Sequence, residues 1–220
     1  TRGLAWRFVT VELMVAVIGG YSATALFLAF AWTDSFRLVL YALVMVIGAM
    51  VGLEIPLLMR ILRDKYDFRD VVAHVLTFDY LGALGASLLF PILLVPRLGM
   101  VRSALAFGVV NALVALWSTH LFRDTLPRRR TLQALCVAAL ALLGAGVVAA
   151  ERITRSAEAD IYADPVIFSR DSRYQHIVLT AWKDDLRLYL NSHLQFSSRD
   201  EYRYHEALVH PGLASHPGAP

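Results

Sequence analysis

Residues 131–155 read TLQALCVAALALLGAGVVAAERITR, and the character of the chain changes within this stretch. Up to Ala150 these residues carry no charged side chain. Such a run has the length of about 20 apolar residues that a helix needs to cross a bilayer. From Glu151 onward, charged residues are frequent. The sequence therefore predicts a transmembrane helical domain over residues 1–150 and a soluble region over residues 151–220.

The composition of the whole chain supports a membrane domain. Of 220 residues, 57% are hydrophobic and 18% are charged, and the mean hydropathy is +0.54, too apolar for an ordinary soluble domain. Before Glu151 the apolar runs cover residues 8–32, 37–62, 71–95, 100–122 and 131–150. We therefore expect an α-helical polytopic membrane bundle of about five transmembrane helices.

Charge and cysteine content exclude several other classes. The net charge of +3 comes largely from arginines between the apolar runs, which is typical of membrane topology and not of a nucleic-acid-binding face. Cys136 is the single cysteine, so an intrachain disulfide cannot form. We expect no metal site and no nucleic-acid partner. Thr1 is not an initiator methionine, and no signal peptide opens the chain, so we expect a piece of a longer protein.

Ionisable residues inside the apolar runs are candidates for function. Glu54 and Asp79 lie deepest in their runs, and Glu12 and His74 lie nearer the ends of theirs. Such groups are costly in a membrane, so Glu54 and Asp79 predict a membrane cavity for a cation. The alternative is structural: Glu12 and His74 reach the interface, while Glu54 and Asp79 bond to neighbouring helices.

Small residues and a proline mark the second and third runs. Gly48 and Gly52 are four residues apart, and Gly82 and Gly85 follow in the third run. This spacing predicts close helix packing at these glycines. Pro56 predicts a kink, because it removes one backbone donor from the helix.

The hydrophobic pattern after Glu151 is that of a sheet. IYADPVIFS (161–169), YQHIVLTAW (174–182) and LRLYLN (186–191) predict three strands, with a polar turn at residues 183–185 between the last two. HLQF (193–196) predicts a fourth. The expected fold of this region is a small antiparallel β-sheet followed by a short helix.

The short helix has predicted start and stop signals. Ser198 with Glu201 three residues later forms a capping box, which predicts the start of a helix. Pro211 and Gly212 predict its end.

Five short motifs in the soluble region occur in an order that identifies a family. They are Tyr174-Gln175, LNSHLQ at 190–195, Asp200-Glu201, YHE at 204–206 and His210-Pro211. They resemble the N-terminal β-sheet region of the polyamine aminopropyltransferases, the spermidine synthase family. VELMVAVIGGYSA (11–23) and GLEIPLLMR (52–60) resemble its bacterial membrane-embedded branch. In that branch two further helices come before this part, and a nucleotide-binding domain follows it.

The resemblance implies a reaction and its substrates. An aminopropyl group passes from decarboxylated S-adenosylmethionine, the co-substrate, to putrescine or a related amine, giving spermidine and methylthioadenosine. No prosthetic group is implied. Gln175 matches the family glutamine that contacts the nucleoside, and Tyr204 and His205 match a pair at the substrate pocket, beside Gln195. These four residues are our substrate-binding candidates. The catalytic base belongs to the following domain, so we expect no catalytic residue here and no activity from residues 1–220 alone.

Alternatives remain open at this stage. Gln175 and Gln195 can be polar residues of a sheet face, and Tyr204 and His205 an exposed helix face. The helical part can be a transporter or a polyamine-sensing module carrying a non-catalytic sheet. The oligomeric state, a homo-oligomer included, stays open. The sequence also departs from the family at Asn191-Ser192, where an Asp-Gly or Asn-Gly is usual, and serine is strained there if φ is positive.

The resemblance implies a multi-pass protein of the bacterial inner membrane, and two arguments disagree about its orientation. Ten Lys and Arg residues flank the helix ends on the side of Thr1 and five flank the other ends, which puts Thr1 in the cytoplasm and, after five crossings, the sheet outside. The sulfonium substrate, however, is made in the cytoplasm. On this chemistry we expect the soluble part in the cytoplasm.

Overall fold

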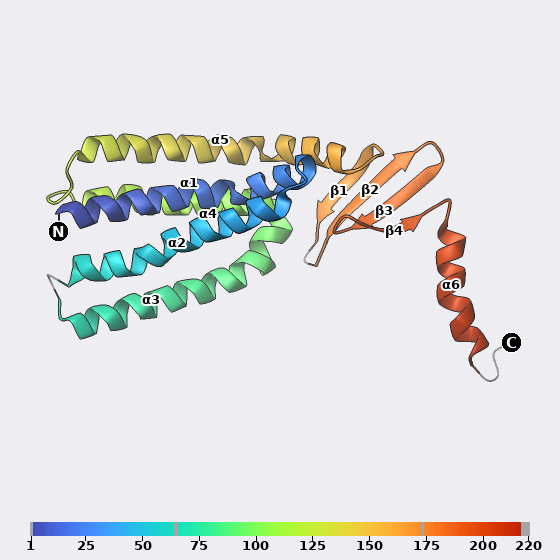
Figure 1. Cartoon of the computed structure of the whole chain (residues 1–220), viewed down its shortest axis with the longest axis horizontal. Helices are drawn as coiled ribbons and strands as arrows, with labels where there is room; N and C mark the ends of the chain where they lie inside the picture. The colour runs from blue at the N-terminus through green and yellow to red at the C-terminus, as the bar shows by residue number, and fades with distance from the viewer. Residues whose placement is uncertain (1, 64–65, 173, 217–220) are drawn as a thin grey trace. The chain divides into compact units, whose positions relative to one another are not determined.

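The computed structural model describes residues 2–63, 66–172 and 174–216. The chain divides into two compact units, Thr1–Ala157 and Glu158–Pro220. The first unit contains the long helices and the second contains the sheet and the last helix (Figure 1).

The first unit is built from long apolar helices. They are α1 (Arg2–Trp32), α2 (Phe36–Leu62), α3 (Phe68–Leu89), the π-helical η1 (Phe90–Leu94), α4 (Val95–Leu121) and α5 (Arg129–Ile161). By length and hydropathy, the described residues contain 4 segments able to cross a membrane, and the third, Phe68–Leu121, joins α3, η1 and α4. This segment is interrupted at Gly99, whose φ of 77° and ψ of 169° are not helical. The chain reverses there, so α3 and α4 run in opposite directions (Figure 1).

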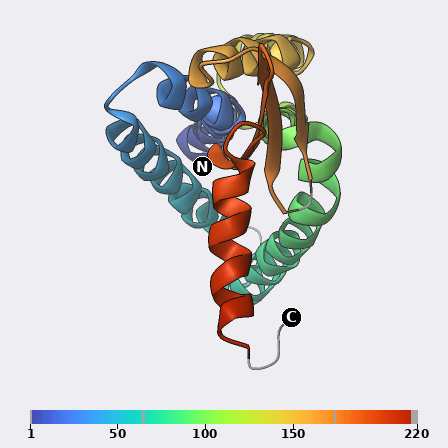
Figure 2. The same cartoon turned by 90° about the vertical axis from the view of Figure 1, so that its right-hand side faces the viewer.

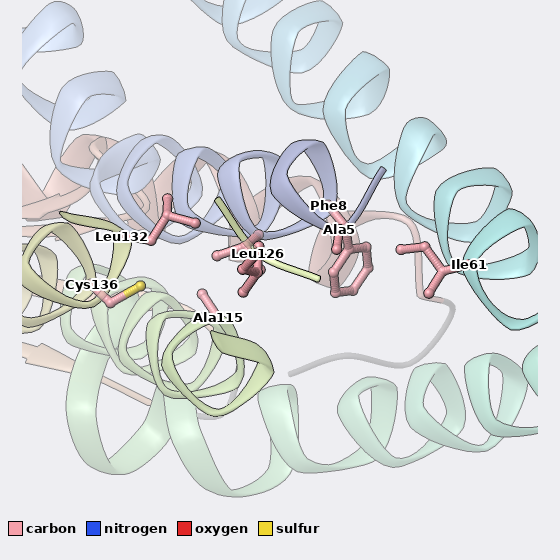
Figure 3. Packing of buried hydrophobic residues seen from close by; sticks show 8 residues of the cluster. Ala5, Phe8, Ile61, Ala115, Leu126, Leu132 and Cys136 are labelled. Carbon is pink, nitrogen blue, oxygen red and sulfur yellow. The ribbon is translucent and has the colours of Figure 1, made fainter. Parts of the chain in front are cut away.

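The buried core of this unit lies along α1. One cluster joins Ala5, Phe8, Val9, Ile61, Ala115, Leu126, Leu132 and Cys136, which come from α1, α2, α4, α5 and the α4–α5 connection (Figure 3). Cys136 is fully buried in it, as packing and not as a reactive thiol. By contrast, Met50 and Ile61 are the buried residues described in α2, and Val71 in α3. The outer helices α2 and α3 therefore expose most of their apolar side chains.

The closest helix contact is between α1 and α4. It lies at glycines other than those for which the sequence predicts close packing. A Cβ atom placed on Gly108 would lie 2.6 Å from the carbonyl oxygen of Ala16 and 2.9 Å from the Cα atom of Gly20. The two backbones touch here because neither glycine has a side chain. Among the described residues, the predicted close packing at Gly48 and Gly52 does not occur, since a Cβ atom there would meet nothing within 4 Å. The same is true of Gly82 and Gly85.

The second unit has a four-stranded antiparallel sheet in the order β1-β2-β3-β4. Its strands are β1 (Val166–Asp171), β2 (His176–Trp182), β3 (Asp185–Leu190) and β4 (His193–Ser197), followed by α6 (Glu201–Ala214). The strands lie where the sequence predicts them, with corrections at their ends. Residues 161–165 precede β1, Tyr174 and Gln175 precede β2, and Asn191 lies in the β3–β4 turn. Asp185 belongs to β3, so the β2–β3 turn consists of Lys183 and Asp184.

The predicted capping box is wrong. The N-cap of α6 is Asp200, which makes no side-chain cap, and the helix starts at Glu201. The hydroxyl of Ser198 is used elsewhere: it donates to Asp185 Oδ1 at 3.2 Å and accepts the N–H of Leu186 at 2.8 Å. The Ser198 hydroxyl therefore bonds to Asp185 and Leu186 on β3 instead of capping α6. The helix also continues through Pro211 to Ala214, beyond its predicted end, and extends away from the end of β4 (Figure 2).

The β3–β4 turn has the geometry that makes serine unfavourable. Asn191 and Ser192 have φ angles of 50° and 66°. Positive φ at both central residues defines a type I′ turn, which favours Asn-Gly because a Cβ atom is strained in this region.

Replacing Ser192 with glycine should therefore stabilise the sheet by about 1 kcal/mol. The measurement is thermal unfolding of the purified chain in detergent, followed by hydrogen exchange in β3 and β4. Ser192→Ala is the matched control, because it removes the 3.4 Å hydrogen bond from the Tyr162 hydroxyl but keeps the strained φ. Equal stability of the glycine and alanine variants would contradict the strain argument.

Candidate functional site

Gln175 lies in a tight turn between β1 and β2. The Ser172 hydroxyl accepts the N–H of Gln175 at 3.0 Å and donates to the Gln175 carbonyl oxygen at 2.8 Å. The next residue, His176, donates its N–H to Asn191 Oδ1 at 2.9 Å. Gln175 is half-buried, and its backbone is fixed between the β1–β2 and β3–β4 turns. The sequence order Tyr174-Gln175 thus corresponds to a rigid turn with a polar side chain.

Gln195 lies at an irregularity in the edge strand β4. Leu188 pairs with Phe196 and Tyr189 pairs with Leu194, so Gln195 is the extra residue of a β-bulge. Bulges redirect side chains and are frequent beside functional sites. Gln195 is exposed.

Tyr204 and His205 lie on α6 and are both exposed. The ring of His205 lies 6.0 Å from that of Tyr204 and 6.4 Å from that of Phe196, centroid to centroid. Phe196 follows Gln195 on β4. The structure therefore brings Gln195, Tyr204 and His205 to one region of the second unit, where β4 meets α6.

Gln175 is not in that region. β1 ends and β2 begins at the turn that holds Gln175, and antiparallel pairing puts the start of β4 at the same end of the sheet. α6 follows the other end of β4, as Figure 1 shows. Gln175 and the α6 pair are therefore attached to opposite ends of the sheet. A substrate that contacts both must extend along it.

Sequence reasoning missed the polar centre of this unit, Asp185. Its side chain is 3% exposed and accepts Ser197 Oγ–H at 2.8 Å and Arg187 Nε–H at 2.7 Å. It also accepts Ser198 Oγ–H at 3.2 Å and the backbone N–H of Arg199 at 3.4 Å. Burial alone would raise the pKa of Asp185, but the hydrogen bonds from Ser197, Arg187 and Arg199 lower it below its usual value. One carboxylate thus fixes the segment that connects β4 to α6.

Arg187 connects Asp185 to Asp164, which precedes β1. Its Nη1 atom lies 2.7 Å from Asp164 Oδ2, while its Nε atom bonds Asp185. The pKa of Arg187 is raised by its hydrogen bond to Asp185 and by the nearby Asp164 charge. The pairing of β3 with β4 is the signal that could have revealed the role of Asp185. Arg187 pairs with Ser197, so Asp185, two residues earlier, lies beside residues 198–199.

A second polar group ties β1 to β2. His176 Nδ1 lies 2.8 Å from Asp171 Oδ1, and His176 Nε2 lies 3.4 Å from Ser169 Oγ. The order Ser-His-Asp is that of a nucleophilic triad. The Ser169–His176 distance, however, exceeds the 2.6–3.2 Å expected of a nucleophile and its base. We interpret the group as a link between strands.

The ionisable residues of the first unit differ from the structural alternative. Glu12 is 9% exposed and does not reach a surface, and Oε1 of Glu54 is buried without a hydrogen-bond partner in the described chain. Asp79 is exposed, and the Nδ1 atom of His74 lies 2.7 Å from the carbonyl oxygen of Asp70 on its own helix. Within residues 2–63, 66–172 and 174–216, no cluster of acidic, His or Cys side chains could hold a metal ion.

The first unit also has a pocket of about 240 Å³ near the C-terminal end of α2. It is lined by Pro56, Met59, Arg60, Arg63 and Phe68. Neither Glu54 nor Asp79 lines it, so the predicted membrane cavity at these two residues stays a prediction.

Comparison with known proteins finds relatives with one shared name over nearly all of the chain. No family model and no solved structure matches. The chain is 53% identical over 219 residues to polyamine aminopropyltransferase 2 of Ralstonia nicotianae, covering 97% of this chain and 43% of the relative. It is 46% identical to the polyamine aminopropyltransferase of Leptospira interrogans (98% and 43% covered) and 43% identical to that of Mycobacterium tuberculosis (96% and 42%). The chain thus spans about two-fifths of the length of these relatives and is similar, over nearly all of its residues, to a part of polyamine aminopropyltransferases.

Proposed function

We propose that this chain is part of an enzyme that transfers an aminopropyl group from decarboxylated S-adenosylmethionine to putrescine or a related amine. The observation that carries the proposal is the 53% identity, over 97% of the chain, to a protein named polyamine aminopropyltransferase. The names of the relatives favour this activity over a transporter or a sensing module.

The proposed reaction is a substitution at carbon. The amine nitrogen attacks the propyl carbon next to the sulfonium, the carbon–sulfur bond breaks, and its electron pair goes to sulfur, which leaves as neutral methylthioadenosine. The nitrogen then loses a proton to a general base. We assign no base within residues 1–220, and no prosthetic group is needed.

The second unit would contribute substrate contacts. Gln175 would bind the nucleoside, since its amide can donate and accept hydrogen bonds. The rings of Tyr204 and His205, with Gln195 beside them, would face the reacting cations, because aromatic faces attract positive charge at close range. The hydroxyl of Tyr204 would also hydrogen-bond a substrate. The separation of these residues from Gln175 suits two substrates bound along the sheet.

Two substitutions in the full-length protein test these roles. Gln175→Ala and Tyr204→Phe should each lower kcat/KM by about 5- to 150-fold, which corresponds to about 1–3 kcal/mol for an unpaired polar partner. The measurement is release of methylthioadenosine from decarboxylated S-adenosylmethionine and putrescine.

Tyr202→Phe is the matched control on the same helix. Tyr202 is 52% exposed, and its hydroxyl accepts a hydrogen bond from Arg203, so its loss should leave the kinetics unchanged. No methylthioadenosine release by a folded wild-type protein would contradict the activity. Normal kinetics in both variants would remove Gln175 and the Tyr204 hydroxyl from the site.

We also propose that α1 to α5 cross the bacterial inner membrane. The support is the hydropathy of the candidate spans, between 1.8 and 2.4, and the exposure of large apolar residues on the outer helices, such as Met45 at 75% and Phe78 at 70%. In water such surfaces would aggregate, whereas in lipid they are solvated. Because the sulfonium substrate is cytoplasmic, we place the second unit in the cytoplasm.

A single cysteine probes this orientation. Tyr174 is 91% exposed in the β1–β2 turn, so a cysteine there should react fully with a membrane-impermeant maleimide in lysed cells and remain unlabelled in intact cells. Cys136 can stay, because it is fully buried, and the chain without the new cysteine is the control. Prompt labelling in intact cells would put the sheet outside.

A further inference from the structure

We propose that the pocket at the C-terminal end of α2 binds the phosphate headgroup of an anionic membrane lipid. The pocket has a volume of about 240 Å³, and its lining comes from the last turns of α2 and from the start of α3. The two helices pack on each other and run in opposite directions, so the pocket lies where one ends and the next begins (Figure 1). The proposal rests on the proposed membrane crossing, because a lipid reaches this pocket from a bilayer.

The polar side of the pocket consists of Arg60 and Arg63. Both side chains are exposed, and neither guanidinium forms a hydrogen bond or an ion pair with a described residue. Asp67, which precedes α3, accepts the backbone N–H of Arg69 at 3.3 Å and is not paired with either arginine. Side chains three residues apart lie on the same side of a helix, so the two guanidinium groups are neighbours. Guanidinium groups bind phosphate through paired N–H donors, which makes a phosphate the favoured anion here.

The apolar side of the pocket consists of Pro56, Met59 and Phe68. Pro56 and Met59 lie nearer the middle of the candidate span Phe36–Leu62 than the two arginines do. Phe68 is 57% exposed, and its ring centroid lies 6.0 Å from the guanidinium carbon of Arg63, so it borders the polar side as well. The pocket therefore changes along α2 from apolar, towards the middle of the span, to basic at the helix end. A lipid has the same order, with acyl chains in the hydrocarbon core and the phosphate at its edge.

These features favour a lipid headgroup over a free phosphate or a nucleotide. The volume of about 240 Å³ is below the roughly 300–1,000 Å³ of pockets that enclose a whole drug-sized ligand, so it suits a headgroup. A free phosphate would leave the apolar side uncovered, whereas the glycerol and first acyl carbons of a lipid would cover it. Basic pockets between transmembrane helices bind anionic headgroups in other membrane proteins. We expect phosphatidylglycerol to bind better than phosphatidylethanolamine, whose ammonium group compensates the phosphate charge.

Photolabelling in a bilayer of known composition locates the site. Full-length protein is placed in phosphatidylcholine nanodiscs that contain phosphatidylglycerol with a diazirine near the headgroup, and the labelled residues are identified by mass spectrometry. We expect label within residues 56–63 or at Phe68. Unlabelled phosphatidylglycerol should displace it at least about tenfold more effectively than phosphatidylethanolamine or inorganic phosphate does.

Single substitutions separate the pocket from a general attraction between basic residues and anionic lipid. Arg60→Gln and Arg63→Gln should each weaken the labelling at least about fivefold, the effect of one basic group beside an anionic headgroup. Arg69→Gln is the matched control, because Arg69 is also exposed, lies in the first turn of α3 and does not line the pocket. An equal loss in all three variants would show a diffuse attraction and overturn the pocket. Unchanged labelling in both pocket variants would overturn it as well.

The remaining outcomes distinguish this proposal from the membrane crossing on which it rests. Extraction of cell membranes with alkaline carbonate tests the crossing alone. Protein released by carbonate would contradict the crossing and the lipid site together, whereas protein retained in the membrane without label in the pocket would overturn the lipid site alone. Equal displacement by inorganic phosphate would overturn a lipid as the ligand, and equal displacement by phosphatidylethanolamine would overturn the preference for an anionic one.

Discussion

Replacing Gly108 with alanine should destabilise the helical unit more than any other single methyl group added to it. The new Cβ atom would lie 2.6 Å from the carbonyl oxygen of Ala16 and 2.9 Å from the Cα atom of Gly20. Both are backbone atoms, so no side chain can rotate away, and α1 and α4 must separate. Overpacking of this kind costs about 1–3 kcal/mol or more, which exceeds the gain of about 1 kcal/mol in helix propensity.

Thermal unfolding in detergent, followed by far-ultraviolet circular dichroism, measures this effect. Gly48→Ala is the matched control, since its Cβ atom would meet nothing within 4 Å and only the propensity gain remains. We expect the Gly108 variant to unfold at a lower temperature than wild type and the Gly48 variant at the same or a higher one. The reverse order would mean that α2, and not the α1–α4 contact, holds the closest packing.

These glycines show where sequence reasoning fails for the helices. Apolar runs can be recognised because length and hydropathy are local properties, and each run largely coincides with one of the helices α1 to α5. Which glycines touch depends on which helices are neighbours, which no local pattern records. Gly48 and Gly52 have the expected spacing, but a Cβ atom at either would meet nothing described within 4 Å, whereas Gly108 lies opposite Gly20, which is 88 positions earlier in the sequence (108 − 20).

In the second unit, local sequence patterns predict the strands but not the partners of polar side chains. Alternating Val, Ile and Leu places the strands, and the positive φ that would make Ser192 strained is present. The Ser198 capping box fails because a buried carboxylate from β3 competes for the hydroxyl. The roles of Gln175, Tyr204 and His205 follow from resemblance, and motif order could not show that they lie at opposite ends of the sheet.

Replacing Asp185 with alanine should cause the largest loss of stability in the second unit. The substitution leaves the hydroxyl of Ser197, the backbone N–H of Arg199 and Arg187 Nε–H without their acceptor in this carboxylate, and removes one of two acceptors of the Ser198 hydroxyl. Ser197 and Arg187 are half-buried, and donors that lose their partner away from water are destabilising. Because these donors connect β4 to α6, His205 should also lose its position beside Phe196.

Hydrogen exchange followed by mass spectrometry can locate this loss. We expect fast exchange across residues 186–205 in the Asp185→Ala variant, with α1 to α5 unchanged. Asp184→Asn is the matched control: the neighbouring carboxylate is 73% exposed and pairs with Arg199 on the surface, a kind of pair that contributes about 0–1 kcal/mol. Equal exchange in the two variants would contradict a central role for Asp185.

Acid should unfold the sheet through the same carboxylate. The pKa of Asp185 is lower in the folded chain than in the unfolded chain, because its burial is outweighed by hydrogen bonds from Ser197, Arg187 and Arg199. The charged form is therefore stabilised by folding. Its contribution is fully present above the unfolded pKa of about 4 and is lost as the pH falls through the lower folded value. The measurement is hydrogen exchange of β3 and β4, with the rates corrected for the intrinsic effect of pH. Protection of these strands in the wild type should fall below pH 4, whereas the Asp185→Asn variant should be less protected at neutral pH and change less on acidification. If the two proteins lost protection in parallel, the acid sensitivity would belong to other carboxylates.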